Sequence, residues 1–328
     1  MVGGSNTKLN LSWGIEKSTD ASLSEILLDN FINFYDWGLL DAGSFYTINI
    51  PQSGIYGGDR HKLRLVSEPN YTDGQVWEGY RQNWVWEGNG NIDGVSEQPL
   101  DITGVYVDGV FYANGNVTKP FYIDYPLGRV VFDSAESTTS DVQIAYSHKR
   151  VQVLPGKGDS WFRQIQQNSF RTDQNFQVAG SGGWIRLGQT RVQLPALAVE
   201  VVPARETEGF QLGGGKWIRS DLVFYVMAEN HWEALNLVDT IVSQDERTLT
   251  LYDTTKVAQS GVSPFTFENG KERELRGHAT ASGLYPQLVE NYPFKKCWIY
   301  DSKGDNVTQL ATDLYIGIAR CKTEVGPV

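Results

Sequence analysis

The sequence predicts an α+β protein with mainly β structure, in which antiparallel hairpins are followed by a strand–strand–helix–strand unit. One observation is the stretch from Trp184 to Asp253, where two β-rich segments flank the glycine turn Gly213–Gly215 and are followed by a helical pattern and another strand pattern. A second is residues 102–153, where short β-rich segments alternate with turn dipeptides such as Asp108-Gly109. The third is composition, since 12% aromatic residues and 34 glycines in 328 residues are typical of short strands joined by tight turns.

The totals limit the class of protein. A chain of 328 residues is long enough for two domains, each with its own core. The formal net charge of -11 argues against a general nucleic-acid binder, which needs a basic face to neutralise phosphates. The N-terminal residues lack an apolar run behind a basic start, and no apolar stretch approaches the ~20 residues that span a bilayer. We therefore expect a protein that is made in a cytoplasm and binds neither a membrane nor nucleic acid in general.

The N-terminal part is predicted to be an arm followed by a helix. Residues 1–20 are polar and rich in Gly and Ser, which indicates a flexible arm that becomes ordered only against another surface. Residues 21–153 are predicted to form one domain, with a helix that is capped at Ser22 or Ser24 and is followed by antiparallel hairpins. The apolar face of this helix must cover a surface, either its own sheet, which we favour, or a neighbouring subunit. The candidate packing or interface residues are Ile26, Leu27, Ile32, Phe34 and Tyr35.

A cluster of tryptophans follows in the sequence VWEGYRQNWVWEGNG. Its large aromatic side chains are Trp77, Tyr80, Trp84 and Trp86. Aromatic faces of this kind bind sugar rings or bases, so the cluster is a candidate glycan surface or protein interface. The alternative is a hairpin whose tryptophans point into the core or an interface, and the sequence favours this alternative.

Residues 154–328 are predicted to form a second domain with a sheet and a helix. Leu197 to Val202 are apolar and β-branched enough for a buried strand, which we expect Pro203 to end because proline cannot donate into a β-ladder. Apolar residues recur at helical spacing over residues 234–242, and Arg247 to Tyr252 alternate in the manner of a strand.

No motif indicates a catalytic, cofactor-binding or metal-binding site. The loop Asn89–Gly94 has the spacing that opens a calcium loop, but the twelfth position is Leu100 and not a bidentate Glu, so we expect a hairpin turn there. The segment LGGGKW departs from a phosphate loop at Phe210 and Trp217. The four histidines, His61, His148, His231 and His278, lie far apart in the sequence. A glycoside hydrolase with two facing carboxylates that sequence cannot place is a third, remote hypothesis.

The two cysteines do not form a disulfide framework. Cys297 and Cys321 lie in predicted C-terminal strands, where they could meet across a pair of strands. We favour two reduced and partly buried thiols, because free cysteine is among the most buried residue types.

Three stretches resemble structural proteins of tailed bacteriophages. YIDYPLGRVVFDSA and DVQIAYSHKRVQV (residues 122–135 and 141–153) resemble a hairpin of phage neck, baseplate and tail components. LPALAVEVVPARE and LGGGKWIRSDLVFYVMAENHWEALNLVDTI (residues 194–206 and 212–241) resemble small α+β neck and tail-completion proteins. SLSEILLDNFINFYDWGLLDAGSFYTINI (residues 22–50) is also similar to phage virion components. The resemblance covers roughly half of the chain and transfers no functional residue, because such families act through surfaces.

The resemblance implies a structural protein of a tailed-phage virion, at the neck or at the head-to-tail or tail junction, of the tail-completion or connector type. Its expected partners are copies of itself and other virion proteins, and its expected location is the virion, assembled in the host cytoplasm. Aromatic residues are enriched at protein interfaces, which agrees with this hypothesis. The alternative is a glycan-binding receptor or a capsid-decoration protein that uses the cluster from Trp77 to Trp86.

Overall fold

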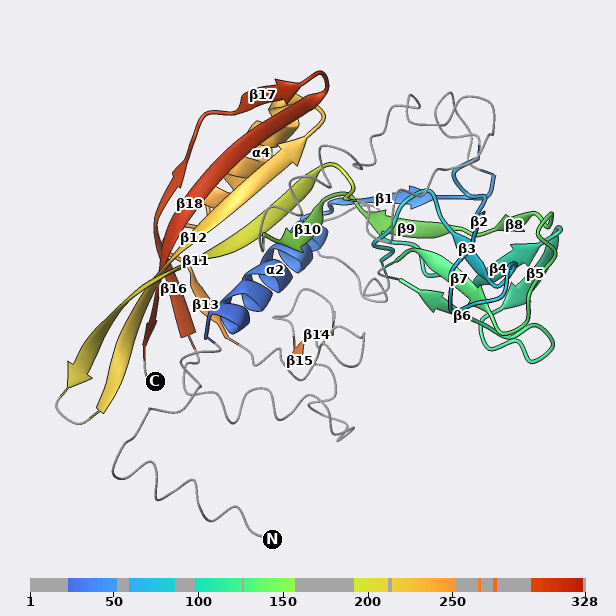
Figure 1. The fold of residues 1–328 in the computed structure, drawn as a ribbon, viewed down its shortest axis with the longest axis horizontal. Coiled ribbons are helices and arrows are strands. Elements are labelled where there is room, and N and C mark those ends of the chain that lie inside the picture. The colour runs from blue at the N-terminus through green and yellow to red at the C-terminus, as the bar shows by residue number, and fades with distance from the viewer. Residues whose placement is uncertain are drawn as a thin grey trace, which may run out of the picture.

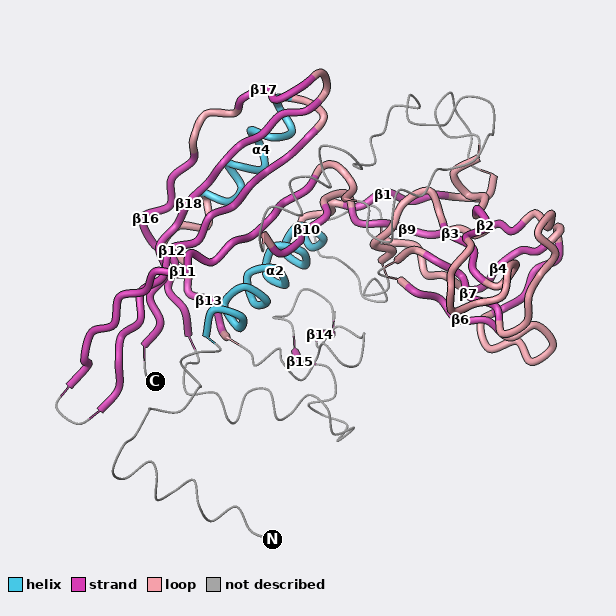
Figure 2. The backbone as a smooth tube through the Cα atoms, viewed as in Figure 1, coloured by secondary structure: helices cyan, strands magenta, loops and turns pink. Residues whose placement is uncertain are grey.

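A computed structural model describes residues 23–51, 59–85, 98–125, 127–156, 192–211, 214–251, 265–266, 274–275 and 296–326. Strands dominate these residues, which contain two helices, so the predicted α+β class with mainly β structure is confirmed. Figure 2 shows the two helices among many strands. The predicted N-terminal arm and the possible calcium loop lie outside the described residues.

A hairpin unit is formed by the first nine strands (Figure 1). It contains a four-stranded sheet of order β2-β3-β7-β6, a three-stranded sheet of order β5-β4-β8 and the antiparallel pair β1-β9. The strands are β1 (Phe45–Ile48), β2 (Arg64–Val66), β3 (Val76–Glu78), β4 (Gly104–Val107), β5 (Val110–Ala113), β6 (Phe121–Asp124), β7 (Arg129–Phe132), β8 (Val142–Gln143) and β9 (Tyr146–Lys149). All pairings among them are antiparallel, as the turn dipeptides predict.

A sheet unit is built on seven strands. Its main order is β10-β11-β12-β18-β16-β13, with β17 paired to β18, and only the β10–β11 pairing is parallel. The strands are β10 (Gln152–Pro155), β11 (Ala196–Gln211), β12 (Gly214–Ala228), β13 (Thr248–Thr250), β16 (Lys296–Gly304), β17 (Thr308–Ala311) and β18 (Leu314–Gly326). A separate two-stranded sheet pairs β14 (Phe265–Thr266) with β15 (Glu274–Leu275).

The predicted strand–strand–helix–strand unit is present as β11, β12, α4 (His231–Val242) and β13. The side chain of Asn230 caps α4 by accepting a hydrogen bond from the Glu233 amide at 2.8 Å. The expectation that Pro203 ends the preceding strand is wrong, because β11 continues to Gln211. The register between β11 and β12 shifts between Val201 and Arg205, and such an irregularity leaves a position at which no ladder donor is needed.

The N-terminal helix α2 (Leu23–Asp41) belongs to the sheet unit and not to the hairpin domain with which the sequence groups it. It packs on β10 and β11, and in Figure 1 it runs along the sheet. Ile26, Leu27 and Tyr35 are buried there, and Ile32 and Phe34 are partly buried against the same core. The ring of Tyr35 lies 5.2 Å from that of Phe224 on β12. The apolar face of α2 therefore covers a sheet of its own chain and is not an open interface.

Both helices cover the same face of the seven-stranded sheet. One hydrophobic cluster joins residues of α2 and α4 to alternate residues of β11, β12, β16 and β18. Cys297 and Cys321 lie in this cluster as free, buried thiols. Burial raises the pKa of Cys297 to about 12 and also raises that of Cys321. The opposite face of the sheet has no helix on it among the described residues.

Three basic side chains contact hydrogen-bond acceptors of the sheet unit. Arg81 and Lys149 belong to the hairpin unit, and Arg150 follows its last strand, β9. Arg81 Nη2 donates to the Leu194 carbonyl at 2.8 Å, and Lys149 Nζ lies 2.6 Å from Asp36 Oδ2 on α2. Arg150 donates to Glu233 Oε1 through Nε at 3.1 Å and Nη2 at 2.6 Å. Burial lowers the pKa of Arg81, which is the most deeply placed of the three cations.

Within the described residues, no helix is long and apolar enough to cross a membrane.

Val238 of α4 fits into a notch that is formed by two glycines of the sheet. A Cβ at Gly317 would lie 2.5 Å from Val238 Cγ2, and one at Gly304 would lie 2.7 Å from Val238 Cγ1. The helix can approach the sheet closely because neither glycine has a side chain.

We expect Gly317→Ala to lower the free energy of unfolding by about 1–3 kcal/mol, because the added methyl group overpacks this contact. Val238→Ala in the same chain should recover part of the loss, since it removes the colliding methyl groups. Gly209→Ala is the matched control, because a Cβ there has nothing within 4 Å. Denaturant titration measures all four proteins, and equal effects at Gly317 and Gly209 would contradict the proposed notch.

Candidate functional site

The tryptophan cluster lies in the core of the hairpin unit. Trp77, Tyr80 and Trp84 are 3%, 8% and 1% exposed, whereas Trp86 lies outside the described residues. Trp77 Nε1 donates to the Gly74 carbonyl and Trp84 Nε1 to the Arg81 carbonyl, both at 2.8 Å. These three side chains therefore fill the core, as the favoured interpretation has it. They do not form an open glycan surface or interface, because their faces are covered by their own chain.

His148 lies beside this cluster in a buried, hydrogen-bonded position. It is 3% exposed, and Nδ1 donates to the Lys149 carbonyl at 3.0 Å. Burial lowers its pKa to about 3, with a smaller contribution from the positive charge of Arg81. The imidazole is therefore neutral in the folded protein at neutral pH and contributes to packing.

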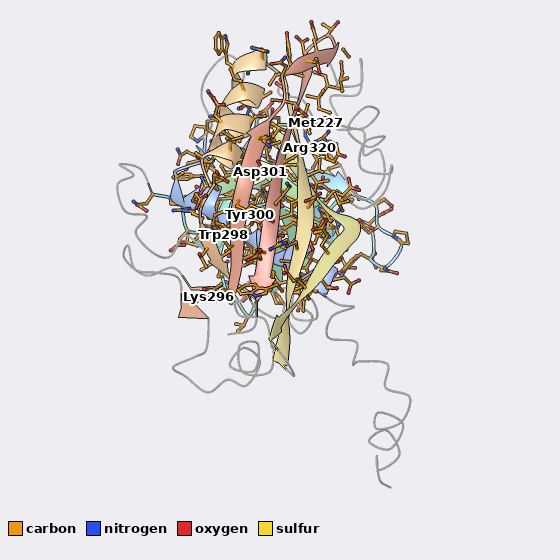
Figure 3. The ribbon with its side chains drawn as sticks, turned by 90° about the vertical axis from the view of Figure 1, so that its left-hand side faces the viewer. Met227, Lys296, Trp298, Tyr300, Asp301 and Arg320 are labelled. Atoms are coloured by element: carbon orange, nitrogen blue, oxygen red, sulfur yellow. The ribbon has the colours of Figure 1, made fainter. Side chains whose placement is uncertain are left out.

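A second candidate surface is the open face, which we define as the side of the seven-stranded sheet away from α2 and α4. Its end near Met227 is apolar and is covered by Val192 and Leu194. The rest carries charged and aromatic side chains. Figure 3 shows the open face, with Lys296, Trp298, Tyr300 and Asp301 along β16 and Arg320 beside them.

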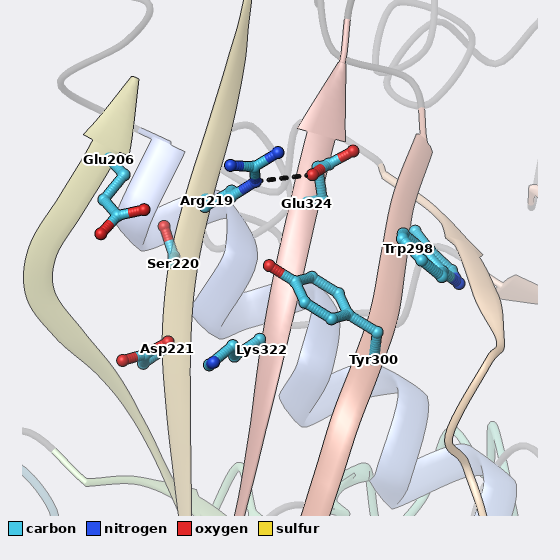
Figure 4. A pocket seen from close by; sticks show the side chains of 8 residues that line it. All are labelled: Glu206, Arg219, Ser220, Asp221, Trp298, Tyr300, Lys322 and Glu324. Atoms are coloured by element: carbon cyan, nitrogen blue, oxygen red, sulfur yellow. Dashed lines mark hydrogen bonds and ion pairs between the residues drawn. The ribbon is translucent and has the colours of Figure 1, made fainter. Parts of the chain in front are cut away.

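The open face is organised in rows because strands in register place their side chains side by side. One row runs across β11, β12, β18 and β16, and it consists of Glu206, Arg219, Glu324 and Trp298. The next row consists of Asp221, Lys322 and Tyr300. Figure 4 shows both rows. Opposite charges are therefore neighbours across the central pair of strands, β12 and β18, in both rows.

Ion pairs hold these side chains in place. Arg219 Nε donates to Glu324 Oε2 at 2.7 Å, and Lys322 Nζ lies 3.0 Å from Asp301 Oδ2. The hydrogen bond that Arg219 donates to Glu324 raises the pKa of Arg219, and hydrogen bonds from Lys303 and Lys322 lower the pKa of Asp301. The cations of these pairs are largely exposed to solvent, so the pairs contribute little to stability.

Aromatic side chains border the charged rows. The rings of Trp298 and Tyr300 are stacked at 4.9 Å with an interplanar angle of 21°, and Trp298 is 39% exposed. The ring of Trp217 covers Gly326, where a side chain would collide with it. Between the aromatic pair and β11 lies a hollow of about 690 Å³, lined by Glu206, Arg219, Ser220, Asp221, Trp298, Tyr300, Lys322 and Glu324.

This arrangement is suited to binding. Neither Glu324 nor Asp301 lies in an apolar pocket, and each is in contact with a cation. Within the described residues, no group of three or more His, Cys, Asp or Glu side chains is placed to hold a metal ion. Trp, Tyr and Arg, which border the hollow, are the residues that dominate binding energy at protein interfaces.

The distal part of the β11–β12 hairpin is a second exposed feature, which we call the arm (residues 205–211 and 214–217). β10 pairs only with Ala196–Val199, so the outer edge of β11 has no partner strand beyond that point among the described residues. In Figure 1 the arm projects away from the rest of the sheet. Glu206 and Glu208 are exposed on it, and charged side chains on an edge disfavour uncontrolled pairing with other strands.

Sequence reasoning missed the open face. Its signal is the alternation in KKCWIYDSKG, where Lys296, Trp298 and Tyr300 alternate with the buried Cys297 and Ile299. A strand whose polar side carries large aromatic residues indicates an exposed binding surface. Known protein families offer no guide, because no family model matches the chain and no curated protein is similar to it at a significant level.

We expect His148 to make the fold sensitive to acid. Unfolded histidine takes up a proton near pH 6.5, whereas folded His148 remains neutral down to about pH 3. Between these values the unfolded state binds more protons, so the free energy of unfolding falls as the pH falls, by up to about 1.4 kcal/mol per pH unit from this residue.

Denaturant titrations of wild type and His148→Gln, repeated from neutral to acidic pH, measure the effect. A plot of the free energy of unfolding against pH should have a smaller slope for the variant. The same substitution at the exposed His231 is the control and should keep the wild-type slope. Identical slopes for all three proteins would show that His148 is protonated in the folded state without cost.

Proposed function

We propose that this protein is a structural component of a tailed-bacteriophage virion, at the neck or head-to-tail junction, that acts through protein–protein contacts in a symmetric assembly. The open face is the observation that carries the proposal. It combines Trp298, Tyr300 and Arg219 at a hollow on a rigid sheet, which is the composition and support of a protein-binding surface.

The arm adds a second kind of contact. An extended hairpin that projects from a sheet offers backbone and side chains to a neighbour without disturbing its own core. Head-to-tail contacts made by two different surfaces close into rings when the rotation between subunits allows it. The unpaired outer edge of the arm is a candidate surface for such a contact, in addition to the contact that the open face makes.

The resemblance of residues 22–50, 122–153, 194–206 and 212–241 to phage virion components supports the same proposal. The glycan-binding alternative depended on the cluster from Trp77 to Trp86, and its described members are buried. The open face is therefore the better candidate for the working surface.

The proposal predicts that particles made without this protein are incomplete. In a phage that encodes the chain, a stop codon at its start should yield filled heads and separate tails when lysates are viewed by electron microscopy. Complementation with the wild-type chain should restore joined particles, and mass spectrometry should then detect the protein in them. Complete, infectious particles without the protein would overturn the proposal.

A further inference from the structure

We propose that the open face binds the open face of a second copy of this chain, about a two-fold axis that runs parallel to the strands between β12 and β18. The proposal rests on the proposed function only in that a symmetric assembly needs contacts between copies. It names the surface, the partner and the residues that face one another.

The register of the sheet makes the open face complementary to itself. A two-fold axis along the strands keeps each row opposite the same row and exchanges β12 of one copy with β18 of the other. Arg219 then faces Glu324 of the second copy, because these two residues are partners in one row. In the next row, Asp221 faces Lys322 of the second copy for the same reason. In both of these rows, each central residue therefore meets an opposite charge.

The same axis exchanges the flanking strands β11 and β16. Glu208 on β11 then lies opposite Lys296 of the second copy, and Glu200 lies opposite Lys303, since each pair occupies one row. A two-fold axis perpendicular to the strands would instead place each residue of the row through which it passes opposite the same residue of the second copy. Arg219 would then face Arg219. The charge pattern thus selects the axis along the strands.

The charge balance of the open face also favours contact between copies. The whole chain carries a net charge of -11, so two copies repel each other on average. The open face, in contrast, carries nearly equal numbers of acidic and basic residues. The acidic ones are Glu200, Glu206, Glu208, Asp221, Asp301 and Glu324, and the basic ones are Arg219, Lys296, Lys303, Arg320 and Lys322. On this face the average repulsion is replaced by local attraction.

The shape of the open face is compatible with such packing. Two facing sheets align their strands within about 30°, which an axis along the strands provides. The hollow of about 690 Å³ in each copy leaves room for the charged side chains and for bridging water. Trp298, which is 39% exposed, lies at the edge of the contact opposite Glu206 of the second copy. Because the contact is made largely by exposed ion pairs, we expect a weak dimer that forms with rising concentration and weakens with salt.

Charge reversal tests the proposed pairing. Arg219→Glu places acids at positions 219 and 324 of both copies, and Glu324→Arg places two cations there, so each variant alone should remain monomeric. A mixture of the two variants brings acids of one chain opposite cations of the other and should form a heterodimer. Sedimentation velocity over a range of concentrations, with one variant fluorescently labelled, measures all three samples beside wild type.

Two controls separate loss of contact from loss of fold. Arg219 has a 42% exposed side chain, so its reversal should leave the fold intact, which circular dichroism and thermal unfolding verify. Lys62→Glu is the matched control, because Lys62 is an exposed cation in an ion pair with Asp59 at 3.6 Å in the hairpin unit. This variant should dimerise as wild type does.

The dimer proposal is overturned if wild type stays monomeric at all concentrations, if the single reversals leave a wild-type dimer unchanged, or if the mixture fails to recombine. These outcomes leave the virion proposal standing, because assembly on a template can use the arm or other surfaces. Complete particles without the protein would overturn the virion proposal and leave the dimer measurement unaffected.

Discussion

The packing of both helices on one face of a single sheet is the constraint on which the rest of this structure depends. α2 lies at the start of the chain and α4 follows β12, yet one hydrophobic cluster contains both. Alternate residues of each strand must therefore be apolar on that face, and the glycine notch at Gly304 and Gly317 lets α4 approach closely. The other face has no helix to cover it among the described residues, so its exposed part has to be compatible with water. That requirement explains the charged residues Arg219 and Asp221 on β12 and Arg320, Lys322 and Glu324 on β18.

The contact between the hairpin unit and the sheet unit differs from the helix packing, because it includes directional hydrogen bonds from charged side chains. Arg81, Lys149 and Arg150 supply the donors, and the Leu194 carbonyl, Asp36 and Glu233 supply the acceptors. Charge-assisted hydrogen bonds are directional, so contacts that reach α2, α4 and the segment before β11 define the orientation of the sheet unit better than an apolar contact of the same size would. Desolvation makes Arg81 costly to bury, and the lowered pKa of its guanidinium reflects that cost. The hairpin unit is thus positioned against the sheet unit without use of the open face.

Local patterns in the sequence predicted the elements, but not which elements pack together. The spacing of Ala234, Leu237, Val238 and Ile241 predicted α4, and the sequence also predicted α2, because apolar periodicity is a local signal. The assignment of α2 to the hairpin domain failed since its partners on β11 and β12 lie more than 150 residues away in the chain, and no local signal carries that pairing. Trp84 was ambiguous for a similar reason: alternation places it on one side of a strand without showing whether that side meets solvent. The rows of the open face could not be predicted at all, because they exist only once β12 and β18 are in register.

Register also links the ion pairs within one chain to its capacity for self-association. Arg219 and Glu324 form an ion pair within one copy because they are cross-strand neighbours. Rotation about the proposed two-fold axis places Arg219 opposite Glu324 of the second copy. The same two residues therefore serve the contact within one chain and the contact between chains. In a dimer of this kind the two arginines and two glutamates form an alternating square in which no charge has to leave its own partner. The separated chain keeps its pairs in water, where they cost little, and association adds attraction without first breaking them. A face built in this way suits a subunit that must remain folded and dispersed until its copies are brought together.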